Sequence, residues 1–288
     1  MTQLLTTNIE LEAALAAARA AGQTIALVPT MGALHAGHLS LVERAHDLAD
    51  IVVVSIFVNP KQFGKNEDFD KYPRTLEADL AAIGDAAEFV YAPSVDQVYP
   101  AQTDASSQTE VPAKSAGAVG ETFEGAARPG HFDGMLTVVA RLFTLVQPDV
   151  AVFGEKDAQQ LFLIRQLAAR DFPELQIVAA ETVREATGLA MSSRNRYLSA
   201  ELLDIAEILP ITLATIDQLL HDGMPLESAL ALGSEMIAGE PETKLEYLAL
   251  VDPKTFQPVS SNHTGAALII VAAIIGGVRL IDNHPVKL

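Results

Sequence analysis

Two histidines, His35 and His38, stand three positions apart in the stretch PTMGALHAGH, which directly follows a short apolar run. Gly32 and Gly37 in the same stretch allow the backbone to approach a ligand closely, because glycine has no side chain. Neutral imidazoles can hydrogen-bond to phosphate oxygens, and protonated imidazoles can counter developing charge. The stretch predicts an anion site. The alternative is a helix cap with two surface histidines.

Two further polar clusters follow apolar runs. The stretch VNPKQFG offers Asn59, Lys61 and Gln62 to a substrate, and FGEKDAQQ places Lys156 and Asp157 at a predicted helix start. Because the helix macrodipole disfavours a cation at a helix N-terminus, Lys156 indicates a phosphate ligand rather than a surface charge. The alternative for the first cluster is an ordinary loop between a strand and a helix.

The last two clusters carry arginine. RPGHFDG places Arg128 and His131 before a predicted helix, and AMSSRNRYLS places Ser192, Ser193 and Arg194 side by side. Hydroxyls together with a guanidinium can wrap a polyphosphate. The alternatives are a capped loop and a Ser-rich loop with a surface arginine. Five such clusters in one chain lead us to infer an anionic, phosphate-bearing ligand.

A scaffold that brings the clusters together is predicted by the alternation of apolar runs with amphipathic stretches. Continuous apolar strands joined by crossover helices are typical of an α/β fold with a parallel, doubly wound, Rossmann-like sheet. In such a sheet, ligands bind beyond the carboxyl ends of the strands, where helix N-termini offer free N–H groups. We predict strands at 24–30, 51–58, 87–93, 149–155 and 175–183, and helices at 40–48, 75–86, 135–147 and 157–171.

The pattern changes near residue 185. Helices are predicted within 200–238, followed by short strands at 245–252, 267–274 and 278–283, which is typical of an α+β arrangement. We therefore expect a domain of residues 1–182 and a smaller C-terminal domain of residues 183–288. The polar stretch 102–125 lacks periodicity and is a candidate mobile loop over a site.

Composition limits the function classes. The formal net charge of −18 argues against a nucleic-acid partner and requires any anionic substrate to find a local group of cations. The absence of Cys excludes a disulfide framework, a zinc–thiolate site and a cysteine nucleophile. The N-terminus lacks the pattern of a signal peptide, and the longest apolar run, 266–278, is too short to span a bilayer. We expect a soluble, cytoplasmic protein with no membrane partner.

The ordered set of motifs resembles a known family. MGALHAGH looks like the His-Ile-Gly-His signature of the nucleotidyltransferase superfamily, and MSSRN looks like its Lys-Met-Ser-Lys-Ser partner. In the order PTMGALHAGH, SIFVNPKQFG, RPGHF, GEKDAQQ and MSSRNRYLS, the motifs are similar to the pantoate–β-alanine ligase family, and the similarity runs over about residues 24–283.

The resemblance implies an enzyme that works in two steps. Pantoate attacks the α-phosphorus of ATP, supplied with Mg²⁺, to give pantoyl adenylate and pyrophosphate. The amine of β-alanine then displaces AMP to give pantothenate. No organic prosthetic group is implied, protein ligands for a metal stay unassigned, and a homodimer built through the smaller domain is expected. The polar stretch 102–125 would keep water from the acyl phosphate.

The resemblance also assigns roles to individual residues. Gln62 would bind pantoate and admit β-alanine, and Gln160 would be the second pantoate contact. Catalytic roles in stabilising charge at the phosphates fall to His35, His38, Lys156, Ser192, Ser193 and Arg194. The ATP site would comprise Met31, Gly32, Ala33, Leu34, His35, Ala36, Gly37, His38, Gly154, Glu155, Lys156, Asp157, Val183, Met191, Ser192, Ser193 and Arg194.

One departure and two rivals stay open at this point. Asp133 in RPGHFDG stands where the family pattern leads us to expect a basic residue, and an anion there would either weaken ATP binding or face solvent. The first rival is another nucleotidyltransferase, which would form no amide and ignore β-alanine. The second is a non-catalytic nucleotide-binding protein, which the presence of His38, Lys156 and the MSSR cluster disfavours. A tRNA synthetase is disfavoured by the acidic charge.

Overall fold

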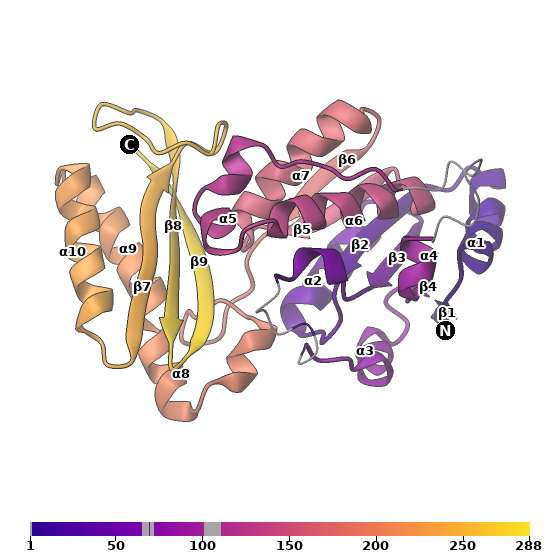
Figure 1. The fold of residues 1–288 in the computed structure, drawn as a ribbon, viewed down its shortest axis with the longest axis horizontal. Coiled ribbons are helices and arrows are strands. Elements are labelled where there is room, and N and C mark those ends of the chain that lie inside the picture. Colours follow the sequence, from indigo (N-terminus) through magenta and orange to yellow (C-terminus); the bar gives the residue numbers. More distant parts are fainter. Residues whose placement is uncertain (1, 65–68, 70–71, 101–110) are drawn as a thin grey trace. The chain divides into compact units, whose positions relative to one another are not determined.

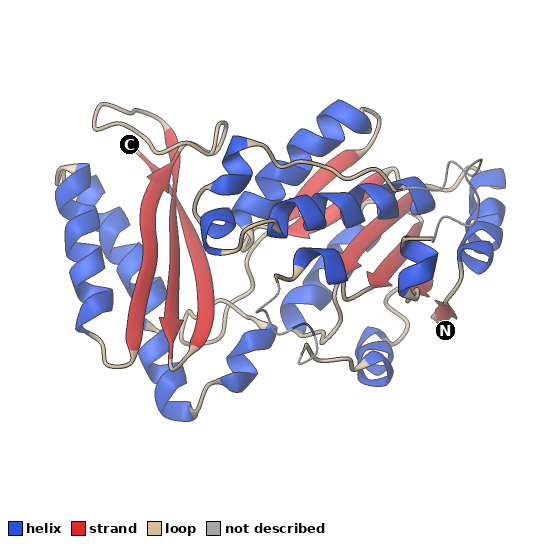
Figure 2. Cartoon of the chain, in the orientation of Figure 1, coloured by secondary structure: helices blue, strands red, loops and turns tan. Residues whose placement is uncertain are grey.

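The computed structural model describes residues 2–64, 69, 72–100 and 111–288 of the chain. The chain divides into two compact units, called unit 1 (Met1–Glu155 with Leu163–Ala180) and unit 2 (Lys156–Phe162 with Glu181–Leu288). Figure 1 labels their elements, and Figure 2 separates helices from strands. The predicted assignment of binding roles to residues 1–182 and 183–288 stays a prediction.

Unit 1 contains a parallel sheet in which the described strands follow the order β1-β4-β3-β2-β5-β6. Its central strands are nearly continuous apolar runs, because a parallel sheet is covered on both faces. β2 lies between β3 and β5, so the winding direction reverses there and creates the switch point at which doubly wound folds bind ligands. The strands are β1 (Gln3–Leu5), β2 (Ile25–Thr30), β3 (Ile51–Ile56), β4 (Phe89–Tyr91), β5 (Val150–Gly154) and β6 (Gln176–Ala180).

Helices cover both faces of this sheet. Leu41, Val42 and Ala45 of α2 pack with alternate residues of β2, β3 and β5 in one apolar cluster. On the other face, Phe143 of α6 meets Phe153 of β5 edge-on, with ring centroids 6.3 Å apart. The predicted doubly wound fold is therefore confirmed. The helices of this part of the chain are α1 (Asn8–Ala20), α2 (Ala36–His46), α3 (Leu76–Ile83), α4 (Val95–Val98), α5 (Glu124–Ala127), α6 (His131–Val146) and α7 (Ala158–Asp171), and the short 3₁₀ turns are η1 (Pro60–Gln62) and η3 (Ala118–Glu121).

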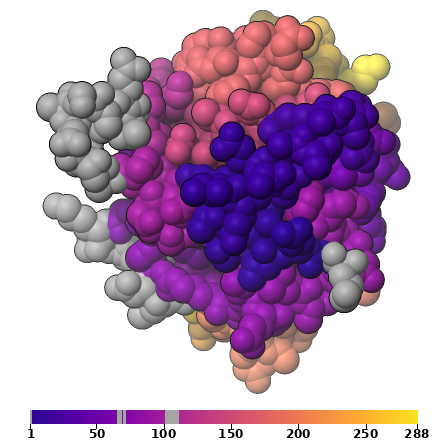
Figure 3. All heavy atoms as spheres, turned by 90° about the vertical axis from the view of Figure 1, so that its right-hand side faces the viewer, coloured from indigo at the N-terminus to yellow at the C-terminus, as the bar shows by residue number. Residues whose placement is uncertain are grey.

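The N-terminal segment adds two elements that the sequence analysis did not predict. β1 pairs with β4 at the sheet edge, and α1 begins with a capping box in which Thr7 accepts from the Glu10 backbone N–H. The indigo atoms of this segment lie across the middle of the face shown in Figure 3. The signal was present in the sequence, since Thr7 followed three residues later by Glu10 marks a helix start.

Unit 2 contains the antiparallel sheet β7-β8-β9, with α9 and α10 packed along it (Figure 1). β8 turns into β9 through Gly276 and Gly277, whose φ angles of 54° and 79° favour glycine. The α+β prediction is confirmed. The elements are η4 (Ser193–Tyr197), α8 (Ala200–Ala206), α9 (Ile208–His221), α10 (Leu226–Gly239), β7 (Thr243–Val251), β8 (Ala266–Ile275) and β9 (Val278–Lys287).

Among the described residues, none of the helices combines the length and apolarity that crossing a membrane requires.

Candidate active site

The loop between β2 and α2 holds the two histidines at the switch point. His35 is the N-cap of α2, and its Nδ1 accepts from the Gly37 backbone N–H at 3.1 Å. His38 lies in the first turn, with its ring centroid 4.1 Å from that of His35. A neutral imidazole whose Nδ1 accepts carries its proton on Nε2, so His35 is set to donate through Nε2. The helix cap, which was the alternative interpretation, is present at His35, and the anion site stays a prediction that the positive end of the α2 dipole at these side chains favours.

Asp79, which the sequence analysis missed, braces this loop from α3. Its carboxylate is 3% exposed and accepts from the backbone N–H groups of Ala33 at 3.0 Å and Leu34 at 2.8 Å. Gly32 and Ala33 have positive φ angles of 79° and 52°, and a Cβ on Gly32 would lie 2.9 Å from an Asp79 oxygen. The loop is therefore held in a conformation that a longer side chain at position 32 would disrupt.

Gln62 reaches the same loop from the end of β3. It is 7% exposed, its Nε2 donates to the Met31 sulfur at 2.8 Å, and its Oε1 accepts from Asn59 Nδ2 at 3.1 Å. Asn59 Nδ2 also donates to the Gly134 carbonyl, and the Tyr99 hydroxyl donates to Asn59 Oδ1 at 2.8 Å. The structure thus brings Met31 and Gln62, two predicted site residues, into contact.

Burial raises the pKa of the Tyr99 phenol, which therefore stays a neutral donor to Asn59 through the physiological range. Lys61 lies over the Tyr99 ring, with its ammonium 4.2 Å from the ring centroid. The amide group of Asn59, rather than a titrating group, therefore fixes the Gln62 side chain.

A second layer behind Gln62 comes from the start of α6. His131 Nδ1 lies 2.9 Å from the Gln62 carbonyl oxygen, and Arg128 Nη1 lies 3.0 Å from His131 Nε2. Because a guanidinium can only donate, Nε2 accepts and Nδ1 carries the proton that is donated to Gln62. Arg128 also pairs with Glu124 at 3.7 Å. The RPGH stretch was predicted as a candidate anion site. In the structure, its His131 hydrogen-bonds to the Gln62 backbone carbonyl.

Gly134 permits this arrangement. A Cβ at this position would lie 2.1 Å from the Lys61 carbonyl oxygen and 2.8 Å from the Gln62 Cα. Only glycine lets α6 approach the η1 backbone so closely, so the position of Gln62 depends on a residue 72 positions further along the chain.

The end of β5 lies beside that of β2. Gly154 closes β5, and the Glu155 backbone N–H donates to the Ala180 carbonyl at 2.9 Å. β2 is flanked by β3 and β5, so the loops carrying Gln62, the histidines and Gly154–Glu155 leave three adjacent strands at one sheet edge. Within unit 1, these predicted residues are therefore gathered where the fold binds ligands.

The other predicted residues belong to unit 2. Lys156 is half-buried and lines, with Ser192, Arg194 and Asp282, a cavity of about 10 Å³, which has room for about one water molecule. Ser192 caps η4, because its Oγ accepts from the Arg194 backbone N–H at 3.2 Å. Val183 and Met191 are joined by a backbone hydrogen bond of 3.0 Å. Of the remaining predicted residues, Asp157 is exposed, and Ser193 and Gln160 are half-buried, the latter in the first turn of α7.

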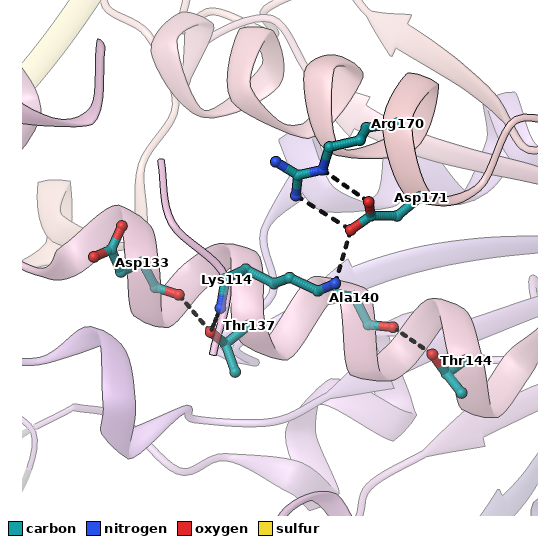
Figure 4. A network of polar contacts seen from close by, with 7 residues as sticks. All are labelled: Lys114, Asp133, Thr137, Ala140, Thr144, Arg170 and Asp171. Carbon is teal, nitrogen blue, oxygen red and sulfur yellow. Dashed lines mark hydrogen bonds and ion pairs between the residues drawn. The ribbon is translucent and has the colours of Figure 1, made fainter. Parts of the chain in front are cut away.

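Asp133, which departs from the family pattern, makes a structural hydrogen bond within unit 1. Its Oδ1 accepts from the Ala116 backbone N–H at 2.7 Å, and its carbonyl accepts from the Thr137 hydroxyl. Thr137 in turn accepts from the Lys114 backbone N–H, and the Lys114 ammonium donates to Asp171 at 2.7 Å (Figure 4). Asp133 is thus committed to holding the chain at Ala116. Of the predicted mobile stretch 102–125, residues 102–110 lie outside the described residues.

In the part of the chain that the structure describes, three or more His, Asp or Glu side chains nowhere gather as a group that could hold a metal ion.

Comparison with known proteins gives a consistent result. The sequence model of the family described as Pantoate-beta-alanine ligase matches residues 3–285. A pantothenate synthetase of Leifsonia xyli subsp. xyli is 47% identical, with 100% of this chain and 98% of the relative aligned. The crystal structure of pantothenate synthetase from Thermus thermophilus matches with a TM-score of 0.88 at 43% identity, covering 99% of both chains.

A further solved structure carries ligands. The pantoate-beta-alanine ligase from Francisella tularensis, complexed with beta-gamma ATP and beta-alanine, matches with a TM-score of 0.75 at 32% identity and covers 99% of this chain and 97% of its own. The family match and the relatives each extend over nearly the full chain. The resemblance predicted from the ordered motifs is confirmed, and the chain belongs to the pantoate–β-alanine ligase family.

Proposed function

We propose that this chain ligates pantoate and β-alanine to pantothenate, using ATP and releasing AMP and pyrophosphate through a pantoyl adenylate. The observation that carries the proposal is the helix start with His35 and His38, held at the sheet switch point beside Gln62, in a chain whose family match spans residues 3–285. The Francisella tularensis relative complexed with beta-gamma ATP and beta-alanine supports both ligand classes.

In the first step, a pantoate carboxylate oxygen attacks the α-phosphorus, and the bond from that phosphorus to pyrophosphate breaks. The pyrophosphate leaves with the electron pair. His35 and His38 donate to the phosphates at the α2 N-terminus, and Lys156, Arg194, Ser192 and Ser193 add charge and hydroxyl donors. Their work is electrostatic, because a carboxylate nucleophile needs no general base.

In the second step, the β-alanine amine attacks the acyl carbon, and the acyl–oxygen bond to AMP breaks. Gln62 binds pantoate in both steps and orients the incoming amine, while Gln160 is the second pantoate contact. Gln62 is 7% exposed, and two side-chain contacts hold it in place. Both features support this role, because an amide held in one position can orient a bound carboxylate for reaction.

The ATP site comprises the residues from Met31 to His38, from Gly154 to Asp157, Val183, and those from Met191 to Arg194. ATP enters as its magnesium complex, because Mg²⁺ in such sites is held largely by substrate phosphate oxygens with one or two carboxylates. We assign ATP and pantoate binding to residues 1–182, and the MSSR loop and dimer contacts to residues 183–288. A homodimer in the cytoplasm is proposed from the family resemblance, and sedimentation of the purified protein tests the dimer.

The proposal is tested by incubating purified protein with MgATP and pantoate, with and without β-alanine. We expect AMP and an amide product in equal amounts only when both acids are present. ADP in place of AMP would contradict the adenylate. Consumption of ATP with a phosphorylated acceptor and no dependence on β-alanine would move the chain to the plain nucleotidyltransferases.

A further inference from the structure

Two residues proposed to meet ATP, Val183 and Met191, lie on one backbone hairpin of unit 2, and Ser192, Ser193 and Arg194 directly follow it. Residues 183–191 form it through hydrogen bonds from the Met191 N–H to the Val183 carbonyl at 3.0 Å and from the Glu185 N–H to the Leu189 carbonyl at 2.8 Å. Arg184 and Ala190 form an antiparallel bridge between its arms. The position of Ser192 and Arg194 therefore depends on how this hairpin is anchored.

Arg184 anchors the hairpin to β9. Its two terminal nitrogens donate to the two oxygens of Asp282 at 2.7 and 3.0 Å, in a bidentate ion pair. The same guanidinium donates to the Gly188 carbonyl at the hairpin turn and to the Asn283 carbonyl. The Asp282 side chain is 1% exposed, so its charge depends on this arginine for compensation. The Arg184 side chain thus binds the turn of its own hairpin and also the adjacent strand β9.

Asn283 extends the anchor to Lys156. Its Nδ2 donates to the Lys156 carbonyl at 2.9 Å, and its backbone N–H donates to Asp282 at 2.8 Å. Asn283 is 7% exposed, and its side chain reaches Lys156 across 127 positions of sequence. Lys156, Arg194 and Asp282 also line the same small cavity. Lys156 and the hairpin are therefore both attached to the same segment of β9, the hairpin through Asp282 and Lys156 through Asn283.

We infer that Arg184, Asp282 and Asn283 are positioning residues for adenylation, which fix Lys156 and the Ser192–Arg194 segment relative to one another. The inference rests on the proposed function and concerns its first step. These side chains act through Lys156 and the Ser192–Arg194 segment, so their loss moves the charged groups at the ATP phosphates. Gln62 and the attack of β-alanine in the second step stay unaffected. A displacement of about 1 Å is enough to cost on the order of 10²-fold in rate.

The test uses Asn283→Ala, because Asp282→Asn removes a buried charge and can unfold unit 2. Pantoate-dependent exchange between ATP and labelled pyrophosphate, measured without β-alanine, reports the first step alone. We expect exchange to fall by about tenfold or more through a raised KM for ATP. The kcat/KM for β-alanine and the melting temperature should stay at the wild-type values. Asn283→Gln, which keeps the amide, should recover part of the exchange.

The matched control is Asp217→Asn, which removes the partner of His284, the next residue on β9, at 3.2 Å. Neighbouring strand residues face opposite sides of a sheet, so this change should leave exchange intact. Unchanged exchange in Asn283→Ala, or equal losses in both steps together with a lower melting temperature, would overturn the inference. A wild-type protein without pantoate-dependent exchange would overturn the proposed function and the inference with it.

Discussion

Lys156 lies just before α7, where a cation is unfavourable unless an anion compensates it, and His38 lies in the first turn of α2. Neither side chain fills an apolar core, because both are half-buried. We propose both side chains as phosphate contacts, and on that proposal substitution should separate activity from stability.

Lys156→Ala and His38→Ala should each slow adenylation by about 10²–10³-fold, the usual effect of removing one preorganised donor from a developing charge. Pantoate-dependent pyrophosphate exchange measures this loss, and circular dichroism should show an unchanged fold. Lys254→Ala, an exposed lysine in the turn after β7, is the control. Full activity of either site variant would contradict the assigned roles.

The predicted site residues share a local signature, and the missed ones do not. His35, Gln62 and Lys156 follow apolar runs or begin helices, so the local sequence pattern predicts them as site residues. Asp79 looks like an ordinary acidic residue of a helix first turn, and its partners lie 45 and 46 positions away. Asp282 lies 98 positions from Arg184. Such contacts depend on the packed fold, which single-sequence patterns do not specify.

At the scale of secondary-structure elements, the strand runs predicted the sheet well, because buried parallel strands are continuous and apolar. Boundaries were less accurate where a helix start lacks an apolar signal. α6 begins at His131, four positions before its predicted start at 135, and its first turn carries both His131, which supports Gln62, and the buried Phe132. Gly134 of α6 and Asp79 of α3 give element-scale tests.

Gly134→Ala should push α6 away from η1, because the new Cβ would lie 2.1 Å from the Lys61 carbonyl oxygen. We expect a loss of about 1–3 kcal/mol in unfolding free energy and a raised KM for pantoate. Chemical denaturation and initial rates measure the two effects. Gly239→Ala at the end of α10 meets open space and should change neither. A wild-type KM for pantoate in Gly134→Ala would contradict the dependence of Gln62 on this contact.

Asp79→Asn should loosen the loop between β2 and α2, since an amide group cannot accept from the N–H groups of both Ala33 and Leu34 through two oxygens. We expect the KM for ATP to rise and unfolding free energy to fall by about 1–3 kcal/mol. Glu77→Gln, an exposed carboxylate on the same helix, should behave as wild type. Equal KM values for ATP in the two variants would refute the bracing role.

At the scale of the whole molecule, the stability of the fold in acid depends in part on the carboxylate of Asp171, which lies outside the proposed site. Hydrogen bonds from Arg170 and Lys114 hold the pKa of Asp171 well below its usual range. A lowered folded-state pKa stabilises the protein above the unfolded-state value of about 4, and this stabilisation is lost as the pH falls below it. The network in Figure 4 joins the chain at Lys114 to the end of α7 and to α6.

Asp171→Asn should lower the melting temperature at pH 7 by roughly 2–4 °C, which corresponds to about 1 kcal/mol for a chain of this size. The difference from wild type should begin to shrink as the pH falls below about 4, because unfolded wild-type protein then takes up a proton at Asp171 that the folded protein does not bind. Asp47→Asn, whose pair with Arg44 is largely exposed, should have little effect at any pH. A difference that stays constant down to pH 3 would contradict the linkage.

The proposed reaction depends on one chemical event, the formation of a bond between the pantoate carboxylate and the α-phosphorus of ATP. Its most direct test is a full turnover with pantoate labelled by ¹⁸O in the carboxylate, followed by mass spectrometry of AMP. Attack on the α-phosphorus and later cleavage of the acyl–oxygen bond leave one labelled oxygen in each AMP. Unlabelled AMP, with the carboxylate oxygen released instead on phosphate, pyrophosphate or water, would contradict the acyl adenylate.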